Sequence, residues 1–566
     1  MRARDRRSSA KGGPPGRVDQ DLSAGAARTC HAETADDPSI AASVTEIEPV
    51  DGFESAVTPL PVVSDSPAGI GEAIRQAAAA DPDRVVLVEG KRRSTFRDLL
   101  DMADRFAAAL EGAGVAPGER VAVLLPNCGW FAAVTIGAWK VGAVPMPLNP
   151  NLTASELAGI FRAGEPAAIV AGPERLAVAR DAAGRVDGLA VRAWFTQREA
   201  EPAATALDAL PPVAAPIWTD QPGDVAAILF TSGTSGRPRG VMLRHQGILF
   251  CIGRLAEMTP IRGETALCGL PLFHVYSLVL VLLAQLLRGG RVVLEPGFQF
   301  PSFLEVMARE RVSTLMAVPP LLQLLVMQSD LVDKIDLSAL RHVFCGGAPL
   351  SRALAERAEA VLGCAIHDGY GLTEMTLVAL ARVGPPVRRG SVGPPLDGVD
   401  VEIRDERGAV LPAGASGQIW VRSPALMKGY FRDEAATARM VVDGWFGTGD
   451  IGNLDADGHL YVTDRIEEII FVGGLNVYPH EVEEVISAFP GVARVAVVAM
   501  KNEATGEVPQ AYIVPQPGAR IEIASLLSFV RGHLAPYKLP KRIRLVGELP
   551  TSPTGKILRV RLRDAT

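Results

Sequence analysis

Residues 231–240, with the sequence Thr231-Ser-Gly-Thr-Ser-Gly-Arg-Pro-Arg-Gly240, are rich in groups that bind anions. They comprise four hydroxyl side chains, three glycines and two arginines, and they follow an apolar run, residues 225–230, that predicts a buried strand. Glycines let the backbone turn tightly toward a phosphate, while hydroxyl and guanidinium groups donate hydrogen bonds to it. On this stretch alone, the composition fits a nucleotide-phosphate loop and an ordinary Ser/Gly turn equally well. It is not the P-loop of nucleoside triphosphatases, because Gly236-Arg237-Pro238 stands where that motif needs Gly-Lys-[Ser/Thr].

Further polar segments follow in order along the chain. They are Asp368-Gly-Tyr-Gly-Leu-Thr-Glu374, Gly444-Trp-Phe-Gly-Thr-Gly-Asp450, Asp464-Arg465 with Gly473-Gly474, and Pro553-Thr-Gly-Lys556. The ordered set resembles the motifs of the adenylate-forming acyl-CoA synthetase superfamily, which includes acyl-CoA ligases, peptide-synthetase adenylation domains and luciferases. The resemblance runs from about Ile70 to the C-terminus and is close to fatty-acid and hydroxycinnamate CoA ligases. It implies an AMP-forming acid–thiol ligase that uses ATP, Mg²⁺ and coenzyme A.

In the implied reaction a carboxylate attacks the α-phosphate of ATP, and a thiol then accepts the acyl group. Both reactants of the first step are anions, so the site must neutralise charge and align the attack. The residues that match the family's ATP-phosphate loop are Thr231, Ser232, Gly233, Thr234, Ser235, Gly236 and Arg239. The family usually has lysine at the last of these positions, and arginine keeps the charge while adding a planar fork of donors.

A second group of residues is implied to line the adenine and the α-phosphate. It consists of Gly347, Ala348, Pro349, Asp368, Gly369, Tyr370 and Thr373. Glu374 matches the acid that holds Mg²⁺, a hard cation that prefers oxygen ligands, although an acid at a helix start would be the plain alternative. Asp450, joined by Arg465, is implied to bind the ribose hydroxyls. The alternative is an Asp–Arg pair at the surface, which would contribute little.

Lys556 lies in a polar turn, residues 551–556, near the end of the chain. Such a lysine is usually a solvated charge, but the resemblance makes it the cation that bridges the attacking carboxylate and the α-phosphate. The domain that carries it must close over the larger domain for the first step and present another face for the second. The residues expected to act in catalysis are Lys556, His274, Thr373 and Glu374.

The second step is implied to use a different segment of the small domain. Gly473, Gly474 and Asn476 match the loop that lines the pantetheine tunnel. Glu467 takes the hinge position, where the family usually has aspartate or lysine. The residue before Gly474 is basic in some CoA ligases, and glycine there removes one contact to a CoA phosphate.

The acyl site is expected at Pro271-Leu-Phe-His-Val-Tyr-Ser277, which resembles the corresponding motif of acyl-CoA ligases. The resemblance places His274 near the carboxylate and Tyr276 in the acyl pocket, while core aromatics at a helix start are the alternative. Peptide-synthetase adenylation domains have an aspartate here to pair an amine, and residues 270–285 contain none. An uncharged, amine-free acid is therefore favoured, and fatty acids of medium or long chain and aryl acids both stay open.

The composition excludes several other classes of protein. The net charge of −7, without a basic stripe, predicts no nucleic-acid binding. No apolar run is long enough to span a bilayer, and no signal peptide is visible. Six cysteines lie scattered without C-x-x-C pairs, which predicts neither a zinc site nor a disulfide framework and favours the cytoplasm.

The length of 566 residues predicts more than one domain. Residues 1–66 alternate basic and acidic stretches without periodicity and predict a disordered extension. Apolar strands alternating with helices predict an α/β domain over residues 67–465, with covered, mostly parallel sheets and a small β subdomain at residues 390–460. Residues 466–566 predict a smaller, mobile α+β lid domain.

The sequence therefore predicts an ATP-dependent carboxylate–CoA ligase whose partner is a small-molecule carboxylic acid. Two alternatives stay open: an acyl-AMP ligase that loads an acyl carrier protein, and a non-catalytic nucleotide-binding homologue. The acid, the pathway and the oligomeric state are left open by the sequence.

Overall fold

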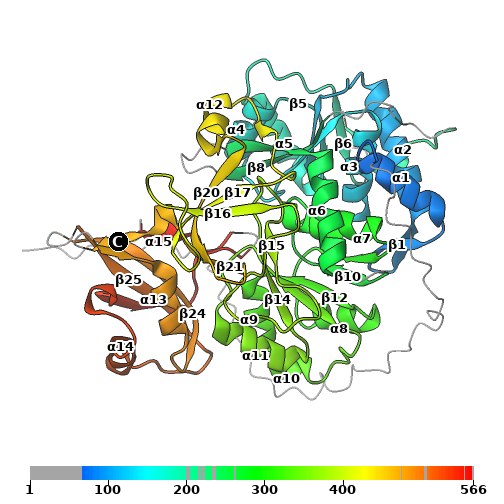
Figure 1. Ribbon diagram of the computed structural model, residues 1–566. Coiled ribbons are helices and arrows are strands. Elements are labelled where there is room, and N and C mark those ends of the chain that lie inside the picture. Colours follow the sequence, from blue (N-terminus) through cyan, green and yellow to red (C-terminus); the bar gives the residue numbers. More distant parts are fainter. Residues whose placement is uncertain are drawn as a thin grey trace, which may run out of the picture. The chain divides into compact units, whose positions relative to one another are not determined.

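The computed structural model describes residues 67–198, 204–214, 218, 224–232, 238–259, 263–472, 475–502, 506–552 and 555–563, and Figure 1 shows their elements. The predicted disordered extension, residues 1–66, lies outside the described residues. So do residues 233–237 of the expected phosphate loop, and Gly473 and Gly474.

The largest sheet is built from short apolar strands. They are β1 (Val85–Glu89), β2 (Arg92–Thr95), β10 (Thr265–Cys268), β11 (Arg291–Leu294), β12 (Thr314–Ala317), β13 (His342–Cys345), β14 (Ile366–Tyr370) and β15 (Ala379–Leu380). Their order in space is β15-β14-β13-β12-β10-β11-β1-β2, and every pair is parallel except those made by the edge strands β15 and β2. Alternate residues of β10 belong to different hydrophobic clusters, Ala266 to one and Leu267 to the other, so both faces of the sheet are covered.

The helices between these strands follow the predicted alternation. They are α6 (His245–Met258), α7 (Ala284–Leu287), α8 (Ser302–Arg309), α9 (Pro319–Met327), α10 (Ser329–Val332) and α11 (Arg352–Leu362). Ser351 caps α11, since its side chain accepts a hydrogen bond from the backbone N–H of Leu354. The helical segment after Val275 begins as a π-helix, η2 (Tyr276–Leu283), before it continues as α7. π-helical turns concentrate at functional sites, and this one begins at Tyr276.

A second sheet of five strands is parallel throughout. Its strands, in chain order, are β3 (Arg120–Leu124), β4 (Val144–Pro147), β5 (Pro166–Ala171), β6 (Ala193–Thr196) and β7 (Thr205–Ala206). The helices of this region are α1 (Ile70–Ala80), α2 (Phe96–Gly112), α3 (Gly129–Lys140), α4 (Ala154–Gly164), α5 (Pro173–Gly184) and the short 3₁₀-helix η1 (Leu207–Ala209). Every residue of α3 is buried, which explains why its sequence is apolar all round.

The strand predicted before the phosphate loop is present as β8 (Val225–Ser232), but it does not belong to a parallel sheet. It forms an antiparallel hairpin with β9 (Pro238–Arg244), and β18 (Gly429–Tyr430) extends this small sheet on the other side of β9. A buried apolar run has the same pattern in either kind of sheet, so the sequence could not distinguish them.

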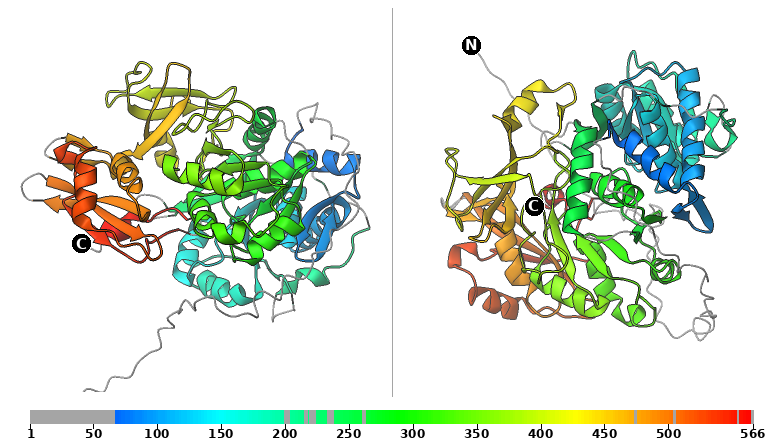
Figure 2. Two further views of the ribbon diagram at one scale, coloured as in Figure 1. Left: turned by 90° about the horizontal axis from the view of Figure 1, so that it is seen from below. Right: turned by 45° about the vertical axis from the view of Figure 1, so that its right-hand side comes forward.

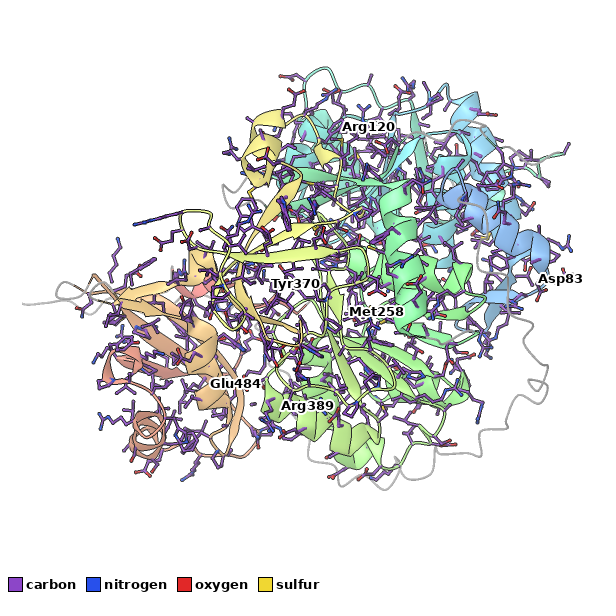
Figure 3. All side chains as sticks on the ribbon, viewed as in Figure 1. Asp83, Arg120, Met258, Tyr370, Arg389 and Glu484 are labelled. Atoms are coloured by element: carbon purple, nitrogen blue, oxygen red, sulfur yellow. The ribbon has the colours of Figure 1, made fainter. Side chains whose placement is uncertain are left out.

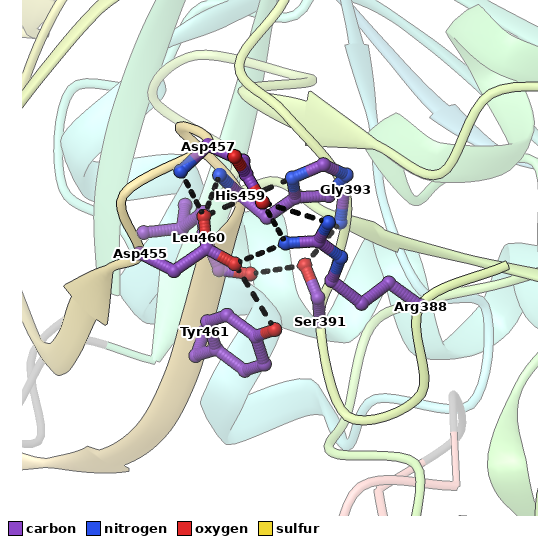
Figure 4. Close-up of polar contacts among 8 residues, drawn as sticks. All are labelled: Arg388, Ser391, Gly393, Asp455, Asp457, His459, Leu460 and Tyr461. Atoms are coloured by element: carbon purple, nitrogen blue, oxygen red, sulfur yellow. Dashed lines mark hydrogen bonds and ion pairs between the residues drawn. The ribbon is translucent and has the colours of Figure 1, made fainter. Parts of the chain in front are cut away.

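The predicted β subdomain is a five-stranded antiparallel sheet. It consists of β16 (Asp400–Arg404), β17 (Gly417–Arg422), β19 (Val441–Val442), β20 (Trp445–Leu454) and β21 (Leu460–Arg465), with the helix α12 (Glu434–Met440) before β19. Arg388 fastens the turn between β20 and β21, because its guanidinium lies 2.7 Å from Asp455 and 2.9 Å from Asp457 (Figure 4). The Ser391 hydroxyl donates to the carbonyl of Leu460 at 2.9 Å in the same place.

The chain from Ile470 onward has a sheet and hydrophobic clusters of its own. Its strands are β22 (Ile470–Val472), β23 (Leu475–Val477), β24 (Val492–Asn502), β25 (Gly506–Pro515) and β26 (Arg542–Leu545). Its helices are α13 (Pro479–Ser487), α14 (Ile523–Arg531), α15 (Arg559–Arg563) and the 3₁₀-helix η4 (Pro536–Lys538), while the 3₁₀-helix η3 (Ile466–Glu468) precedes it. Figure 2 shows this smaller domain in orange and red. A separate smaller C-terminal domain is thereby confirmed, whereas the boundary at residues 465–466 stays a prediction.

None of the helices in the described part of the chain combines the length and the hydrophobicity needed to cross a bilayer.

The cysteines of the described residues are free. Burial raises the pKa of Cys128, Cys251 and Cys268 to about 12, which makes these thiols poor nucleophiles.

Asn127 fixes the segment that follows β10. Its amide nitrogen donates to the carbonyls of Leu270 at 2.9 Å and Cys268 at 3.1 Å, and also to that of Glu295 at 3.0 Å. Its amide oxygen accepts from the backbone N–H of Leu272 at 2.8 Å. Because the side chain is 8% exposed, these bonds replace water for several backbone groups just before His274.

We expect Asn127→Ala to destabilise the protein by roughly 2–4 kcal/mol, because it leaves several buried backbone groups without a partner. The melting temperature should fall. The rate of pyrophosphate release should also fall, with a raised KM for the acid. Asn151→Ala, at an exposed position, is the control and should change neither quantity. An unchanged melting temperature for Asn127→Ala would exclude this role.

Candidate active site

Four neighbouring parallel strands, β10, β12, β13 and β14, end at one edge of the large sheet. Ligands of such sheets bind beyond the carboxyl ends of the strands. A cavity of about 1000 Å³ lies there, and its lining includes residues from the loops after these strands. The β8–β9 hairpin and the C-terminal domain complete the wall, so elements far apart in the sequence share one cavity.

The hairpin brings Thr231 and Arg239 to the cavity as direct cross-strand partners. Gly240, the next residue, is needed for close packing, because a Cβ there would lie 2.8 Å from the side chain of Ile228. Strand β18 places Tyr430 beside this hairpin, and the Arg239 guanidinium lies 5.6 Å from the centre of the Tyr430 ring. This contact orients the arginine at the cavity wall.

Glu374 lines the same cavity after β14 and accepts a hydrogen bond from the Tyr430 hydroxyl at 2.9 Å. Desolvation raises the pKa of this carboxyl above its ordinary value, which means that its charge lacks full compensation. A hard cation would supply that compensation, so the site fits Mg²⁺, which commonly takes one carboxylate, waters and phosphate oxygens. No group of three or more His, Cys, Asp or Glu side chains among the described residues could hold a metal ion by itself. The remaining ligands would therefore have to come from a nucleotide and water.

In the pair of Asp450 and Arg465 the carboxylate is buried, whereas the arginine side chain is partly exposed. Arg465 Nε lies 2.8 Å from Asp450 Oδ1, in accord with their cross-strand register, and Asp450 is 4% exposed. The hydroxyl of Tyr370, a buried residue labelled in Figure 3, donates to Asp450 Oδ2 at 2.5 Å. The Thr448 hydroxyl accepts from the backbone N–H of Asp450 at 3.0 Å. Since Arg465 and Thr448 also line the cavity, the paired carboxylate lies directly behind its wall.

His274 and Tyr276 both line the cavity. Desolvation, followed by the charge of Lys556, lowers the pKa of His274 to about 4, so the imidazole is neutral at physiological pH. The backbone N–H of Tyr276 donates to His274 Nδ1 at 3.4 Å, which assigns the ring proton to Nε2. The Tyr276 hydroxyl lies 3.2 Å from the carbonyl oxygen of Phe344 and 3.3 Å from that of Ala317, and this fixes the ring against two strands.

Lys556 reaches the cavity from the C-terminal domain. Its turn is closed by hydrogen bonds with Ser552, and Gly555 within it has a φ of +80°. A Cβ at Gly555 would lie 2.7 Å from Pro320, so only glycine allows this turn to pack against the start of α9. Desolvation, followed by the charge of Arg465, lowers the pKa of Lys556.

The cavity brings many of the sequence-predicted residues together. Those that line it are Thr231, Arg239, His274, Tyr276, Gly347, Gly369, Thr373, Glu374, Arg465 and Lys556. Other described residues of the expected site do not contribute to the lining: Ala348, Pro349, Asp368, Tyr370 and Asp450. Asp368 is partly enclosed, and desolvation raises its pKa to about 8. The phosphate-loop residues Gly233, Thr234, Ser235 and Gly236, as well as Gly473 and Gly474, lie outside the described residues, as do the side chains of Ser232, Glu467 and Asn476.

Tyr430 and Thr448 are among the side chains at the cavity that the sequence did not reveal. Tyr430 belongs to a strand of two residues, which is too short to produce a recognisable pattern. Thr448 lies inside the recognised segment before Asp450, and its hydroxyl could have been proposed as a support for that carboxylate.

Fold and site together define an enzyme that adenylates its substrate, and comparison with known families agrees. Residues 74–431 match the family model described as AMP-binding enzyme, and residues 481–556 match that described as AMP-binding enzyme C-terminal domain. The chain therefore belongs to the adenylate-forming acyl-CoA synthetase superfamily, in the AMP-forming acid–thiol ligase class.

Individual relatives align with this chain over nearly their whole length. A feruloyl-CoA synthase of an Amycolatopsis species is 36% identical over 88% of this chain and 98% of its own. 4-Coumarate–CoA ligase 2 of Oryza sativa subsp. japonica is 34% identical over 93% of this chain and 97% of its own. Among solved structures, the amide bond synthetase McbA from Marinactinospora thermotolerans has a TM-score of 0.80 and 31% identity, covering 88% of this chain and 99% of that one.

The lowered pKa of Lys556 predicts the pH dependence of the adenylation step. With Lys556 as the cation that the sequence resemblance implies, its charged form is the expected active form. The value of kcat/KM for pyrophosphate release should then be highest below this pKa and should fall as the pH rises through it. The midpoint of the alkaline limb of the pH profile of kcat/KM should lie below the ordinary lysine pKa of 10.5. In Lys556→Arg, which keeps its charge throughout, the limb should move to higher pH while kcat falls. A limb that is identical in both proteins would assign it to another group.

Proposed function

We propose that this protein is an ATP-dependent carboxylate–CoA ligase that forms an acyl adenylate and then an acyl-CoA thioester on an aryl acid of the hydroxycinnamate type. The observation that carries the proposal is the convergence of Lys556, Arg465, Glu374 and His274 on one cavity. A hydroxyl-bearing hairpin with Arg239 opens into the same space, so one cavity has donors for phosphate, carboxylate and a metal ion.

The part of the cavity wall formed by residues 255–380, here called the acyl wall, supports an acid that carries no charge besides its carboxylate. Among the described residues between 255 and 380 that line the cavity, Glu374 is the one charged side chain, given a neutral His274. The apolar members are Leu255, Phe273, Val275, Leu280, Met316, Phe344, Leu372, Leu377 and Leu380. Such a wall favours apolar rings or chains over a second charge. The feruloyl and coumarate relatives favour the aryl class, while fatty acids of medium or long chain stay as the second candidate.

In the first step, the residues of this chain bring two anions together. The ammonium group of Lys556 lies between them and reduces their repulsion, and the Nε2–H of His274 donates to the acid carboxylate. Arg239 binds the phosphates, while Asp450, held by Arg465 and Tyr370, accepts from the ribose hydroxyls. Mg²⁺ held by Glu374 would supply positive charge to the phosphate oxygens. The leaving pyrophosphate remains with the hairpin residues and the backbone around Thr373.

In the second step, the thiol needs access to the adenylate, so the C-terminal domain, residues 466–566, must present another segment to the large domain, residues 67–465. Glu467 is the proposed hinge, and the segment with Gly473, Gly474 and Asn476 is the proposed path of the pantetheine chain. Next to the hinge, Arg559 bridges Glu468 at 2.6 Å and Glu483 at 2.8 Å. This partly buried network holds the start of the C-terminal domain together while its orientation changes.

Lys556→Ala should lower the rate of pyrophosphate release by at least about a hundredfold, because a desolvated cation beside the reacting anions is lost. The matched control is Lys541→Ala, an exposed lysine of the same domain, which should retain full activity. The second step, measured from a supplied acyl adenylate and coenzyme A, should be nearly unaffected in both variants. Equal pyrophosphate release by Lys556→Ala and the wild type would refute the assigned role.

The acid and the acceptor are tested in one panel of fatty, cinnamic, benzoic and dicarboxylic acids, assayed for pyrophosphate with and without coenzyme A. We expect hydroxycinnamic acids to give the highest kcat/KM and the thioester to form with coenzyme A alone. A product that stops at the adenylate would instead favour a carrier protein as acceptor, or an amine as for McbA. No pyrophosphate with any acid would favour a nucleotide-binding homologue without catalysis.

A further inference from the structure

Among the described residues that line the cavity, Thr376 is the one residue other than glycine with positive φ. Five described residues other than glycine have positive φ: Glu165, Arg311, Thr376, Arg432 and Asp443. Thr376, with φ of +63°, is the β-branched one among them and the one that lines the cavity. A β-branched residue with positive φ is a true outlier, because its Cβ substituents collide with the backbone.

Local hydrogen bonds show what kind of turn this is. The backbone N–H of Leu377 donates to the carbonyl of Met375 at 2.7 Å, so Thr376 is the central residue of a γ-turn with positive φ, which is the rare and strained form. The N–H of Thr376 donates to the carbonyl of Leu372, also at 2.7 Å. Met375 and Leu377 are buried, and the thiol of Cys251 donates to the carbonyls of both. The surroundings therefore hold the turn in place from both sides.

The backbone of Thr376 is also enclosed on its carbonyl side. A Cβ at Gly371 would lie 2.1 Å from the Thr376 carbonyl oxygen, so the absence of a side chain at Gly371 makes room for the turn. Thr376 lines the cavity, while its N–H is bonded to the Leu372 carbonyl and its carbonyl oxygen packs against Gly371. Its hydroxyl has no hydrogen-bond partner among the described residues, whereas the Tyr276 hydroxyl is already committed to backbone carbonyls.

Strain that persists in a well-packed segment is a feature of functional sites. Glycine would adopt this conformation without cost, and yet the chain has a branched, hydroxyl-bearing residue there. We propose that Thr376 is a specificity-determining residue of the acyl site, whose hydroxyl hydrogen-bonds to a polar substituent on the acid and whose methyl group limits the size of that substituent. This inference rests on the proposed function and adds to it the residue that selects the acid.

Specificity of this kind arises because a hydrogen bond made to one acid is missing with another. A site that bonds a substrate hydroxyl discriminates strongly against the analogue that lacks it, whereas an apolar pocket discriminates weakly. The apolar wall alone would accept cinnamic and 4-hydroxycinnamic acids with similar efficiency. A single hydroxyl in that wall can separate them.

The test compares Thr376→Ser with Thr376→Ala, because serine keeps the hydroxyl and alanine removes it, while neither is β-branched. The quantity measured is the ratio of kcat/KM for 4-hydroxycinnamic acid to that for cinnamic acid, from pyrophosphate release. We expect the ratio to fall by about tenfold in Thr376→Ala relative to Thr376→Ser, which should resemble the wild type. Equal ratios in the two variants would overturn the hydrogen-bonding role.

The role of the methyl group is tested with Thr376→Gly, which fits the backbone without strain. It should raise kcat/KM for the bulkier 3,5-dimethoxy-4-hydroxycinnamic acid relative to cinnamic acid by about tenfold, with an unchanged or higher melting temperature. Asp443→Gly is the matched control, because it relieves positive φ at an exposed turn outside the cavity and should leave all ratios unchanged. If Thr376→Gly leaves the ratio unchanged, the proposed limit on size is wrong.

Failure of this inference can be told apart from failure of the proposed function. The shift in melting temperature on adding each acid measures binding whether or not the protein turns it over. One outcome is that the protein releases no pyrophosphate with any acid, while the shift in melting temperature caused by 4-hydroxycinnamate still differs between the serine and alanine variants. In that case the proposed function is wrong and the role of Thr376 stands. If the wild type forms thioesters and the variants share its selectivity and its shifts, the function stands and the role of Thr376 is refuted.

Discussion

The constraint on which the site depends is the desolvation of a cation, Lys556, inside a cavity. Water is replaced there by protein groups that compensate the charge only in part, as the lowered pKa shows. Arg239 lines the same space, while the charge of Arg465 is paired with Asp450 and Glu374 brings a carboxylate to the cavity. An anionic ligand beside Lys556 would offset part of its desolvation cost, and the same electrostatics would favour the binding of a nucleotide or a carboxylate.

The carboxylates of the site are held in two different ways. Asp450 is bonded by Arg465 and by the hydroxyl of Tyr370, so its orientation is fixed before a ligand binds. Glu374 accepts a hydrogen bond from the neutral hydroxyl of Tyr430, and its raised pKa, caused mainly by desolvation, reflects charge that is not fully compensated. The arrangement of Asp450 suits a carboxylate that positions hydroxyl groups. The arrangement of Glu374 suits a carboxylate that binds a cation.

The sequence predicted the α/β class, the strand before the phosphate loop and the order of the functional segments, because the apolar run of residues 225–230 is short and is followed directly by a polar loop. It could not predict that β8 pairs antiparallel with β9, since a buried run has no periodicity that distinguishes the two kinds of sheet. Nor could it predict the partners of Glu374, because Tyr430 comes from a strand of two residues far along the chain. The Asp–Arg pair had a plausible surface interpretation, and only the burial of Asp450 excludes it.

The smaller domain explains why the cation can be supplied from so far along the chain. Its strands and helices pack into hydrophobic clusters made from residues from Ile470 onward, so it has a core of its own. Lys556 is held in its turn by Ser552, within the same domain, and Gly555 allows that turn to approach Pro320 of the large domain. The contact with the large domain is not confined to this turn, because Glu484 of α13 accepts a hydrogen bond from the backbone N–H of Arg352 at 3.1 Å. The proposed two-step reaction requires a small domain that keeps its own core while these contacts change, because the lysine proposed for the first step must make way for a thiol in the second.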